Sequence, residues 1–301
     1  MRTVVIASGK GGTGKTTLTA LFSRLAAGSD RVVLVDADVE ASNLPLALSV
    51  EASSCESFTG GGNAWIDPLV CSGCSACEFV CRFGALSFSM ETGVFTVDPW
   101  ACERCGFCVY VCPMDAVRMV DTTVGEACVG TSPVGPLAYG RLEPGQDLSG
   151  RLVSEVRRLG SSEAQEQGLS LVIVDGPPGI GCPVVASIAD TDLLVAVTEP
   201  TVSGEHDLAR IVELARRFDL PVRVILNKSD LSAAGARRIR EYCRLGELQL
   251  IAEIPYDPAF GEYASSANAR TVVGGTAIAE ATLAWRRIES DIAAIRDRTQ
   301  R

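Results

Sequence analysis

Two cysteine runs with one spacing constrain the fold of this chain more than any other feature of its sequence. Each run reads Cys-x2-Cys-x2-Cys-x3-Cys, and the eight residues are Cys71, Cys74, Cys77, Cys81, Cys102, Cys105, Cys108 and Cys112. The second run begins 31 residues after the first, and the same offset relates their neighbours, since Asp67-Pro68, Val80 and Ala85 recur as Asp98-Pro99, Val111 and Ala116. This register predicts two matching half-domains.

Thiolates at this spacing suit iron–sulfur clusters, because iron prefers soft sulfur ligands and three closely spaced cysteines can reach three corners of one cubane. Residues 60–123 resemble the bacterial two-cluster ferredoxins, in which each run lends its fourth cysteine to the other cluster. The resemblance implies one 4Fe–4S cluster on Cys71, Cys74, Cys77 and Cys112, and a second on Cys102, Cys105, Cys108 and Cys81. Arg82 departs from the pattern, because a proline is common after this cysteine, but it removes no ligand.

Structural zinc sites and a disulfide framework are the alternatives for these cysteines. Zinc sites rarely use four cysteines in one run. A disulfide framework belongs to exported proteins, and we find no export pattern in the sequence.

A glycine-rich segment follows the first apolar run of the chain. Residues 4–7 are apolar, residues 9–17 contain four glycines and two lysines, and an amphipathic stretch comes next. This order predicts a strand, a phosphate-binding loop and a helix, because glycines let backbone N–H groups turn toward phosphate oxygens. Lys15 would reach the β- and γ-phosphates, and the Thr16 hydroxyl would bind Mg²⁺. The residues expected to hold the nucleotide are Gly11, Gly12, Thr13, Gly14, Lys15, Thr16 and Thr17.

Lys10 precedes the paired glycines of this loop. With this lysine the loop resembles the deviant Walker A loop of the MinD/ParA/Mrp ATPases and the nitrogenase iron protein. In that family the equivalent lysine reaches the nucleotide of a second subunit. The resemblance therefore implies an ATP-dependent homodimer and assigns Lys10 and Lys15 to the catalysis of ATP hydrolysis.

Three aspartates follow predicted strands at positions that match the same family. Asp36 and Asp38 come after the second apolar run, and Asp175 ends the run at residues 171–174. The resemblance implies that Asp36 and Asp175 hold Mg²⁺ together with Thr16, either directly or through water. Asp38 is the candidate for positioning the attacking water.

Later segments complete the expected nucleotide site. Asn227 follows a predicted strand and can offer a donor and an acceptor to the adenine edge. Residues 255–257, with Pro255 and Asp257, are expected to close the pocket for the base.

Lysine is rare in this chain, which has 27 basic residues but only Lys10, Lys15 and Lys228 as lysines. A planar guanidinium cannot replace a compact ammonium at every position, so the retained lysines mark positions of special need. Two of the three lie in the predicted phosphate loop. For Lys228, chance placement is a reasonable alternative.

Strands that alternate with helices predict a doubly wound, mostly parallel α/β sheet of the P-loop NTPase type. Turn-rich segments flank the cysteine repeat, so we expect it to form an inserted α+β ferredoxin-like domain. The predicted boundaries are residues 1–59 and 124–301 for a discontinuous ATPase domain and residues 60–123 for the insert.

Charge and composition limit the partners and the compartment. The net charge of −10 disfavours nucleic acid, and seven acids against three arginines in the insert favour a redox partner with a basic face. No apolar run reaches membrane-spanning length, and the final predicted helix has mixed charge rather than a lipid-binding basic face. We therefore expect a cytoplasmic protein in a reducing compartment, without a stable membrane anchor.

Four cysteines lie outside the two runs. Cys182 follows the segment after Asp175, where it would face a partner subunit or a transferred cluster, or would be a small buried residue at a helix start, which is the interpretation favoured here. Cys55, Cys128 and Cys243 are expected to be packing residues.

The leading hypothesis for function is an ATPase in which a nucleotide-driven dimer gates electron transfer from two clusters to a partner protein, in redox-cofactor or metal-cluster maturation. It rests on the position of the cysteine repeat between Asp38 and Asp175. One alternative is a scaffold or carrier that delivers iron–sulfur clusters to apo-proteins. A second is a MinD-like positioning ATPase that carries a redox sensor.

Overall fold

The chain forms two compact units. A computed structural model describes residues 1–28, 32–146, 148–258, 260 and 275–299. The larger unit comprises residues 1–56, 127–141 and 149–301, and the smaller unit comprises residues 57–126 and 142–148. The smaller unit thus extends three residues beyond each predicted boundary of the insert, and it adds a second segment that the sequence did not indicate.

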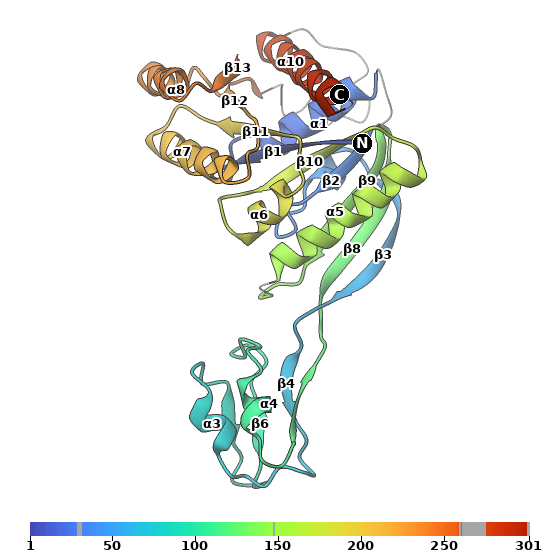
Figure 1. The fold of residues 1–301 in the computed structure, drawn as a ribbon, viewed down its shortest axis with the longest axis vertical. Helices are drawn as coiled ribbons and strands as arrows, with labels where there is room; N and C mark the ends of the chain where they lie inside the picture. The colour runs from blue at the N-terminus through green and yellow to red at the C-terminus, as the bar shows by residue number, and fades with distance from the viewer. Residues whose placement is uncertain (29–31, 147, 259, 261–274, 300–301) are drawn as a thin grey trace. The chain divides into compact units, whose positions relative to one another are not determined.

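Nine strands within the described residues form one sheet in the larger unit, in the order β13-β12-β11-β1-β10-β2-β9-β8-β3 (Figure 1). Neighbouring strands from β13 to β9 are parallel, so their carboxyl ends share one edge of the sheet. The predicted mostly parallel α/β sheet is confirmed. The strands are β1 Arg2–Ser8, β2 Val33–Asp36, β3 Glu51–Thr59, β8 Thr123–Ser132, β9 Gly135–Leu142, β10 Leu171–Pro178, β11 Leu193–Thr198, β12 Val222–Asn227 and β13 Gln249–Ile254.

Helices cover both faces of this sheet, which explains why its central strands are continuous apolar runs. Helices α1 and α10 lie on one face, and α5, α6 and α7 lie on the other (Figure 1). On the first face Phe22 of α1 packs on Trp285 of α10, with ring centroids 5.5 Å apart. In the described part of the chain, no helix has the length and apolarity of a membrane span. The helices of the larger unit are α1 Lys15–Ala26, α2 Leu44–Ala47, α5 Ser149–Glu166, α6 Cys182–Ile188, α7 Val202–Arg216, α8 Ala233–Leu245 and α10 Thr276–Thr299.

A disulfide joins the edge strand β3 to its neighbour β8, from Cys55 on β3 to Cys128 on β8. Their Cα atoms are 4.0 Å apart, as for residues directly opposite each other on adjacent strands. Cys128 is fully buried and Cys55 is exposed. The expectation of a packing residue is therefore wrong for the exposed Cys55 and holds for the buried Cys128, and the bond between the two was not predicted. Of that group, Cys243 is buried and free, as expected.

The smaller unit repeats one set of elements at the 31-residue offset. Helix α3 (Ala76–Val80) corresponds to α4 (Phe107–Val111), strand β5 (Leu86–Phe88) to β7 (Val117–Val120), and β4 (Asn63–Ile66) to β6 (Phe95–Val97). The strands pair across the repeat, because β4 is antiparallel to β7 and β5 is antiparallel to β6. Each half therefore completes the sheet of the other half.

The second segment of the smaller unit, residues 142–148, is held by side chains of the repeat. Arg104 donates hydrogen bonds from Nε to Asn63 Oδ1 at 3.1 Å and from Nη2 to Gln146 Oε1 at 2.5 Å. Gly145 has a φ of 80°, and a Cβ at this position would lie 2.8 Å from the Trp100 ring. This close approach shows why a glycine occurs there.

Candidate functional site

The predicted phosphate loop connects β1 to α1 at the carboxyl edge of the sheet. Gly12 and Gly14 adopt left-handed φ values of 76° and 91°. Side chains avoid this region, and a Cβ on Gly14 would also lie 2.4 Å from Asn227 Nδ2. Thr13 is 1% exposed, and its hydroxyl has no hydrogen-bond partner among the described residues. This unsatisfied donor fits a loop that binds an oxygen-rich ligand.

The two predicted magnesium carboxylates lie at the same edge of the sheet. Asp36 on β2 is in register with Asp175 on β10, and both are buried. Asp175 accepts hydrogen bonds from Thr16 Oγ1 at 2.6 Å and Thr19 Oγ1 at 3.0 Å. Asp36 accepts from Ser42 Oγ at 2.9 Å. The structure thus brings together Thr16 and Asp175, as predicted for one site.

Burial controls the protonation of the carboxylates in this region. Burial, together with the nearby Asp175 carboxylate, raises the pKa of Asp36 to about 8. It raises the pKa of Asp175 to about 6, although Lys15 opposes this shift. Burial also raises the pKa of Asp38, again against the charge of Lys15. Buried carboxylates that resist ionisation fit a site that binds a hard divalent cation.

Lys10 contacts the end of β11 and the start of α7 in its own chain. Its Nζ forms an ion pair with Glu199 and donates hydrogen bonds to Thr201 Oγ1 at 3.2 Å and Ser203 Oγ at 3.1 Å. Burial alone would raise the pKa of Glu199, but hydrogen bonds from Lys10 and Lys228 outweigh it and lower that pKa. Glu199 was missed in the sequence, where an acid two residues after the apolar residues 193–197 was the available signal.

Lys228 also contacts the phosphate loop, so chance placement does not explain why it is a lysine. Its Nζ donates to the Gly12 carbonyl at 2.8 Å and lies 3.3 Å from Glu199 Oε2. All three lysines of the chain are therefore found at this loop. The neighbouring Asn227 donates from Nδ2 to the Thr13 carbonyl at 2.8 Å, which joins the tip of β12 to the loop.

The segment expected to close the base pocket follows β13, the neighbour of β12. The Tyr256 N–H donates to Asp230 Oδ1 at 2.7 Å, and the Asp257 carbonyl accepts from the Phe260 N–H at 3.1 Å. Pro255 and Asp257 are partly exposed. Recognition of adenine by Asn227 and this segment stays a prediction.

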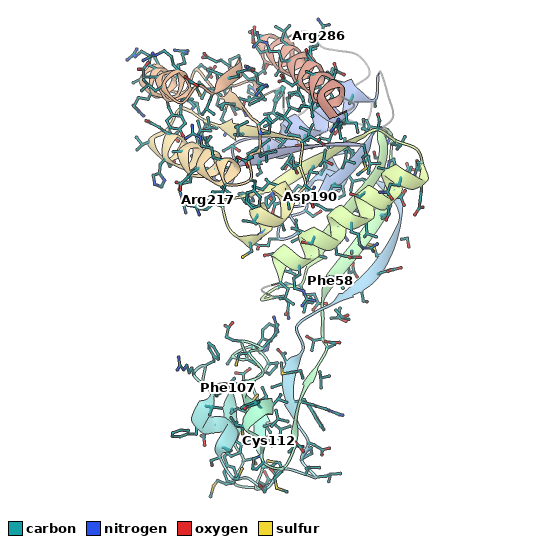
Figure 2. All side chains as sticks on the ribbon, in the orientation of Figure 1. Phe58, Phe107, Cys112, Asp190, Arg217 and Arg286 are labelled. Atoms are coloured by element: carbon teal, nitrogen blue, oxygen red, sulfur yellow. A yellow bond between two sulfur atoms is a disulfide. The ribbon has the colours of Figure 1, made fainter. Side chains whose placement is uncertain are left out.

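The eight cysteines of the smaller unit are free thiols that line two small cavities, of about 10 and 20 Å³. Each cavity collects three cysteines from one run and the fourth from the other. Cys112, labelled in Figure 2, follows α4 and lies with the first run. The cysteines are Cys71, Cys74, Cys77 and Cys112 around the first cavity, and Cys102, Cys105, Cys108 and Cys81 around the second.

Equivalent backbone conformations surround the two cavities. Left-handed residues recur at the 31-residue offset, and the pairs are Gly73 and Arg104, Ser75 and Gly106, and Gly84 and Asp115. Burial raises the pKa of Cys77 and of its counterpart Cys108, and neighbouring cysteines raise both further. Thiolates grouped in this way repel one another unless a cation lies between them, so the residues fit an iron–sulfur cluster in each cavity.

Cys182 is the first residue of α6 and is exposed. The favoured interpretation of a small buried residue at a helix start is therefore wrong in its burial. The thiol is open to solvent in this chain.

The phosphate loop on a mostly parallel sheet defines a P-loop nucleotide-binding protein. Residues 4–269 match the CobQ/CobB/MinD/ParA nucleotide binding domain. The chain belongs to this family.

Known relatives and solved structures agree with this assignment. An uncharacterized protein of Methanocaldococcus jannaschii is 31% identical over 229 residues, which are 76% of this chain and 79% of the relative. The cell division ATPase MinD of Pyrococcus furiosus has a TM-score of 0.57 and 19% identity, covering 96% of this chain and 98% of that one. The septum site-determining protein MinD of Pyrococcus horikoshii, complexed with Mg-ADP, has a TM-score of 0.57 and 16% identity, covering 96% of each chain. At these identities the solved structures show a shared fold.

Proposed function

We propose that this chain is a Mg²⁺-dependent ATPase whose nucleotide-controlled dimer gates electron transfer from two 4Fe–4S clusters to a partner protein. One observation carries the proposal: two cavities each collect four cysteines in a chain that also has a phosphate loop. Membership of a nucleotide-binding family, and the Mg-ADP bound to a protein of the same fold, support the nucleotide part.

Residues of the phosphate loop and of the neighbouring strand ends would have separate roles in ATP hydrolysis. Lys15 would bind the β- and γ-phosphates, and Thr16 with Asp175 and Asp36 would hold Mg²⁺. Asp38 would orient the attacking water. Lys10 would leave Glu199 to reach the nucleotide of a second subunit, so Glu199 competes with dimer formation.

Connectivity supports a link between the nucleotide and the cysteine unit. The chain passes from Asp36 and Asp38 into β3, enters the smaller unit, and returns through β8 before reaching Asp175. A bound cluster supplies a one-electron couple, and the cysteines of this chain fix its ligands and its exposure. Movement of the segment after β2 on nucleotide binding would therefore reach the strand that enters the smaller unit.

An anaerobic, EPR-monitored redox titration with and without Mg-ATP tests the gating. We expect ATP to shift the potential of at least one cluster by about 59 mV or more, which is about 1.4 kcal/mol for one electron. The Lys15→Ala protein, which should bind ATP poorly, is the control and should show no shift. Unchanged potentials in the wild type would exclude gating through potential.

Lys10→Arg tests the dimer. A guanidinium cannot take the place of the compact ammonium at a second nucleotide, so ATP turnover should fall by at least about tenfold while nucleotide affinity stays within about threefold. Steady-state turnover and nucleotide titration measure the two effects. Wild-type turnover in this variant would remove the argument for Lys10.

The exposed thiol of Cys182 favours a second candidate, a carrier that passes clusters to apo-proteins. In a dimer, Cys182 of two subunits could hold a shared cluster. Labile iron that moves to an apo-acceptor, and fails to move from Cys182→Ser protein, would support this function. Eight irons retained per chain, with no transfer, would exclude it.

The third candidate is a positioning ATPase, which the likeness to two MinD structures favours. A fluorescent fusion distinguishes it, because a positioning ATPase gathers at particular places in the cell. Fluorescence spread evenly through the cell would argue against the positioning ATPase and leave the first two candidate functions.

A further inference from the structure

Large apolar side chains are exposed on the smaller unit in matched pairs. Three pairs obey the 31-residue offset, and their members have similar exposed fractions: Leu69 and Trp100 at 94% and 75%, Phe79 and Tyr110 at 93% and 86%, and Phe83 and Met114 at 48% and 47%. Scattered apolar residues are normal on a surface, but exposure that repeats with the fold is not scattered. The repetition points to a surface that has the same purpose in both halves.

Two of these six side chains line the cysteine cavities. Met114 lines the first cavity beside Cys112, and Phe83 lines the second beside Cys81. Both are nearly half exposed, so each is at once part of a cavity wall and part of the surface.

The other four side chains lie close in sequence, or next to a contacting side chain, to residues that line the cavities. Leu69 and Trp100 lie two residues before the first cysteine of each run. Phe107 lines the second cavity and stacks on Tyr110, with ring centroids 6.3 Å apart. Ala76, the counterpart of Phe107, lines the first cavity, and Phe79 follows it by three residues on the same helix face. We name Leu69, Phe79 and Met114 the first rim, and Trp100, Tyr110 and Phe83 the second rim.

Exposed acids accompany the rims. Glu78 precedes Phe79, Glu103 follows Trp100 by three residues, and Asp115 follows Met114, and all three acids are exposed.

Residues 60–123 have seven acids and three arginines, so this segment stays net acidic although Arg82, which precedes Phe83, is exposed. Arg104 is held by Asn63 and Gln146, and Arg118 lies over the Trp65 ring at 4.3 Å. An apolar centre with an acidic surround is complementary to a protein face with an apolar centre and a basic border. It is a poor match for a second copy of the same acidic surface.

We propose that each rim is a docking site for a one-electron carrier protein with a basic-bordered apolar face. This proposal rests on the proposed function, since the rims have a redox purpose only if the cavities hold clusters. A carrier that covers a rim excludes water beside the cluster and brings its own redox group to the opening. The two rims are equivalent, so one kind of carrier finds two sites on each chain.

Ferricytochrome c, a haem protein with a basic docking face, is the probe. Protein reduced with dithionite and desalted without oxygen is mixed with it by stopped flow. Leu69→Ser with Phe79→Ser replaces the two most exposed side chains of the first rim, Trp100→Ser with Tyr110→Ser does the same for the second, and the fourfold variant changes both rims. Met90→Ser is the matched control, because Met90 is 89% exposed on the same unit but its counterpart in the repeat is Asp121.

We expect the second-order rate constant to fall by at least about tenfold in the fourfold variant, and partly in each twofold variant, because aromatic anchors dominate docking energies. Met90→Ser should keep the wild-type rate. If changing both rims slows the reaction no more than Met90→Ser does, the proposal is overturned. Because Trp100 packs on Gly145, Tyr110→Ser alone serves as a second test of that rim.

Iron content and EPR spectra, measured on every variant, separate the two proposals. A wild-type chain without iron defeats the proposed function, and the docking proposal fails with it. If the variants keep their full iron content and reduce ferricytochrome c at the wild-type rate, the docking proposal is wrong and the proposed function is not affected. If the wild type is a dimer without nucleotide and the fourfold variant is a monomer, the rims join two copies, and the carrier proposal is again wrong.

Discussion

At the phosphate loop, two groups of side chains carry charge that the nearby described residues do not neutralise. Asp36 and Asp175 are buried on adjacent strands, while Lys10 and Lys228 share Glu199. A divalent cation would relieve the first imbalance, and a nucleotide would compete for the lysines of the second. Without ligands, burial raises the pKa of Asp36 and of Asp175, whereas the two lysines lower the pKa of Glu199.

The pH dependence of stability follows from Asp36. Its pKa is about 8 in the folded protein and 3.8 in the reference state, so between these values the folded state binds more protons than the unfolded state. The free energy of unfolding should therefore fall as pH rises from about 4 to about 8, by at most about 1.4 kcal/mol per pH unit for this group. Denaturant unfolding in Mg²⁺-free buffer measures it.

Asp36→Asn is the matched variant for this prediction. It removes the titrating proton, so its stability relative to the wild type should be greater at pH 8 than at pH 5. Added Mg²⁺ should reduce the pH dependence of the wild type, because the cation favours the ionised carboxylate. Parallel stability curves for the two proteins would show that Asp36 ionises normally.

At the scale of elements, the sequence predicted what local patterns determine. The glycine loop, the apolar central strands and the cysteine repeat each have a local periodicity or spacing. Each could therefore be predicted from the sequence. Glu199, the Cys55–Cys128 disulfide and the segment at 142–148 depend on contacts between residues far apart in the chain. A local pattern can mark a residue such as Glu199, but it does not identify the distant residues that this residue contacts, and Cys182 was misjudged in burial for the same reason.

The loop between β1 and α1 makes a prediction about two of its glycines. Gly14→Ala should destabilise the protein by about 1–3 kcal/mol, because alanine is strained at a φ of 91° and its Cβ would meet Asn227. Gly11→Ala is the control, since a Cβ there has no atom within 4 Å, and it should cost less than about 0.5 kcal/mol. Thermal unfolding of both variants measures the difference, and equal losses would contradict the conformational argument.

The bond between β3 and β8 makes a second prediction at this scale. Cys55→Ser opens the disulfide at its exposed end and should lower stability by about 2–4 kcal/mol, as for disulfides that close long loops. Reductant should then have no further effect on that variant. Cys182→Ser changes another exposed cysteine and should leave both stability and sensitivity to reductant unchanged. A mass shift after alkylation verifies the bond, and an alkylated Cys55 in untreated wild type would disprove it.

At the scale of the whole molecule, each unit has a core of its own. The core of the larger unit contains Phe22, Ile173 and Trp285, and that of the smaller unit contains Cys77, Phe95 and Val117. The contacts of the phosphate loop described above all lie in the larger unit. The nucleotide site and the cysteine cavities are thus separable in principle.

Removal of the insert tests this separation. A chain in which a short turn replaces residues 57–126 should fold and bind Mg-ADP within about threefold of the wild type, which is about 0.6 kcal/mol, and should contain no iron. Calorimetric titration and iron analysis measure both. Loss of nucleotide binding in a folded variant would show that the smaller unit completes the nucleotide site.

The gathering of all three lysines at one loop makes this protein unusual as a target for amine chemistry. Acylating reagents, and enzymes that acetylate lysine, would find every ε-amino group of the chain within the contacts of Gly12, Glu199 and the start of α1. Lys10 and Lys228 are partly exposed, whereas Lys15 is buried. The extent of amine labelling would therefore report the occupancy of the phosphate loop directly, and coupling this protein to a surface through its lysines would block the loop.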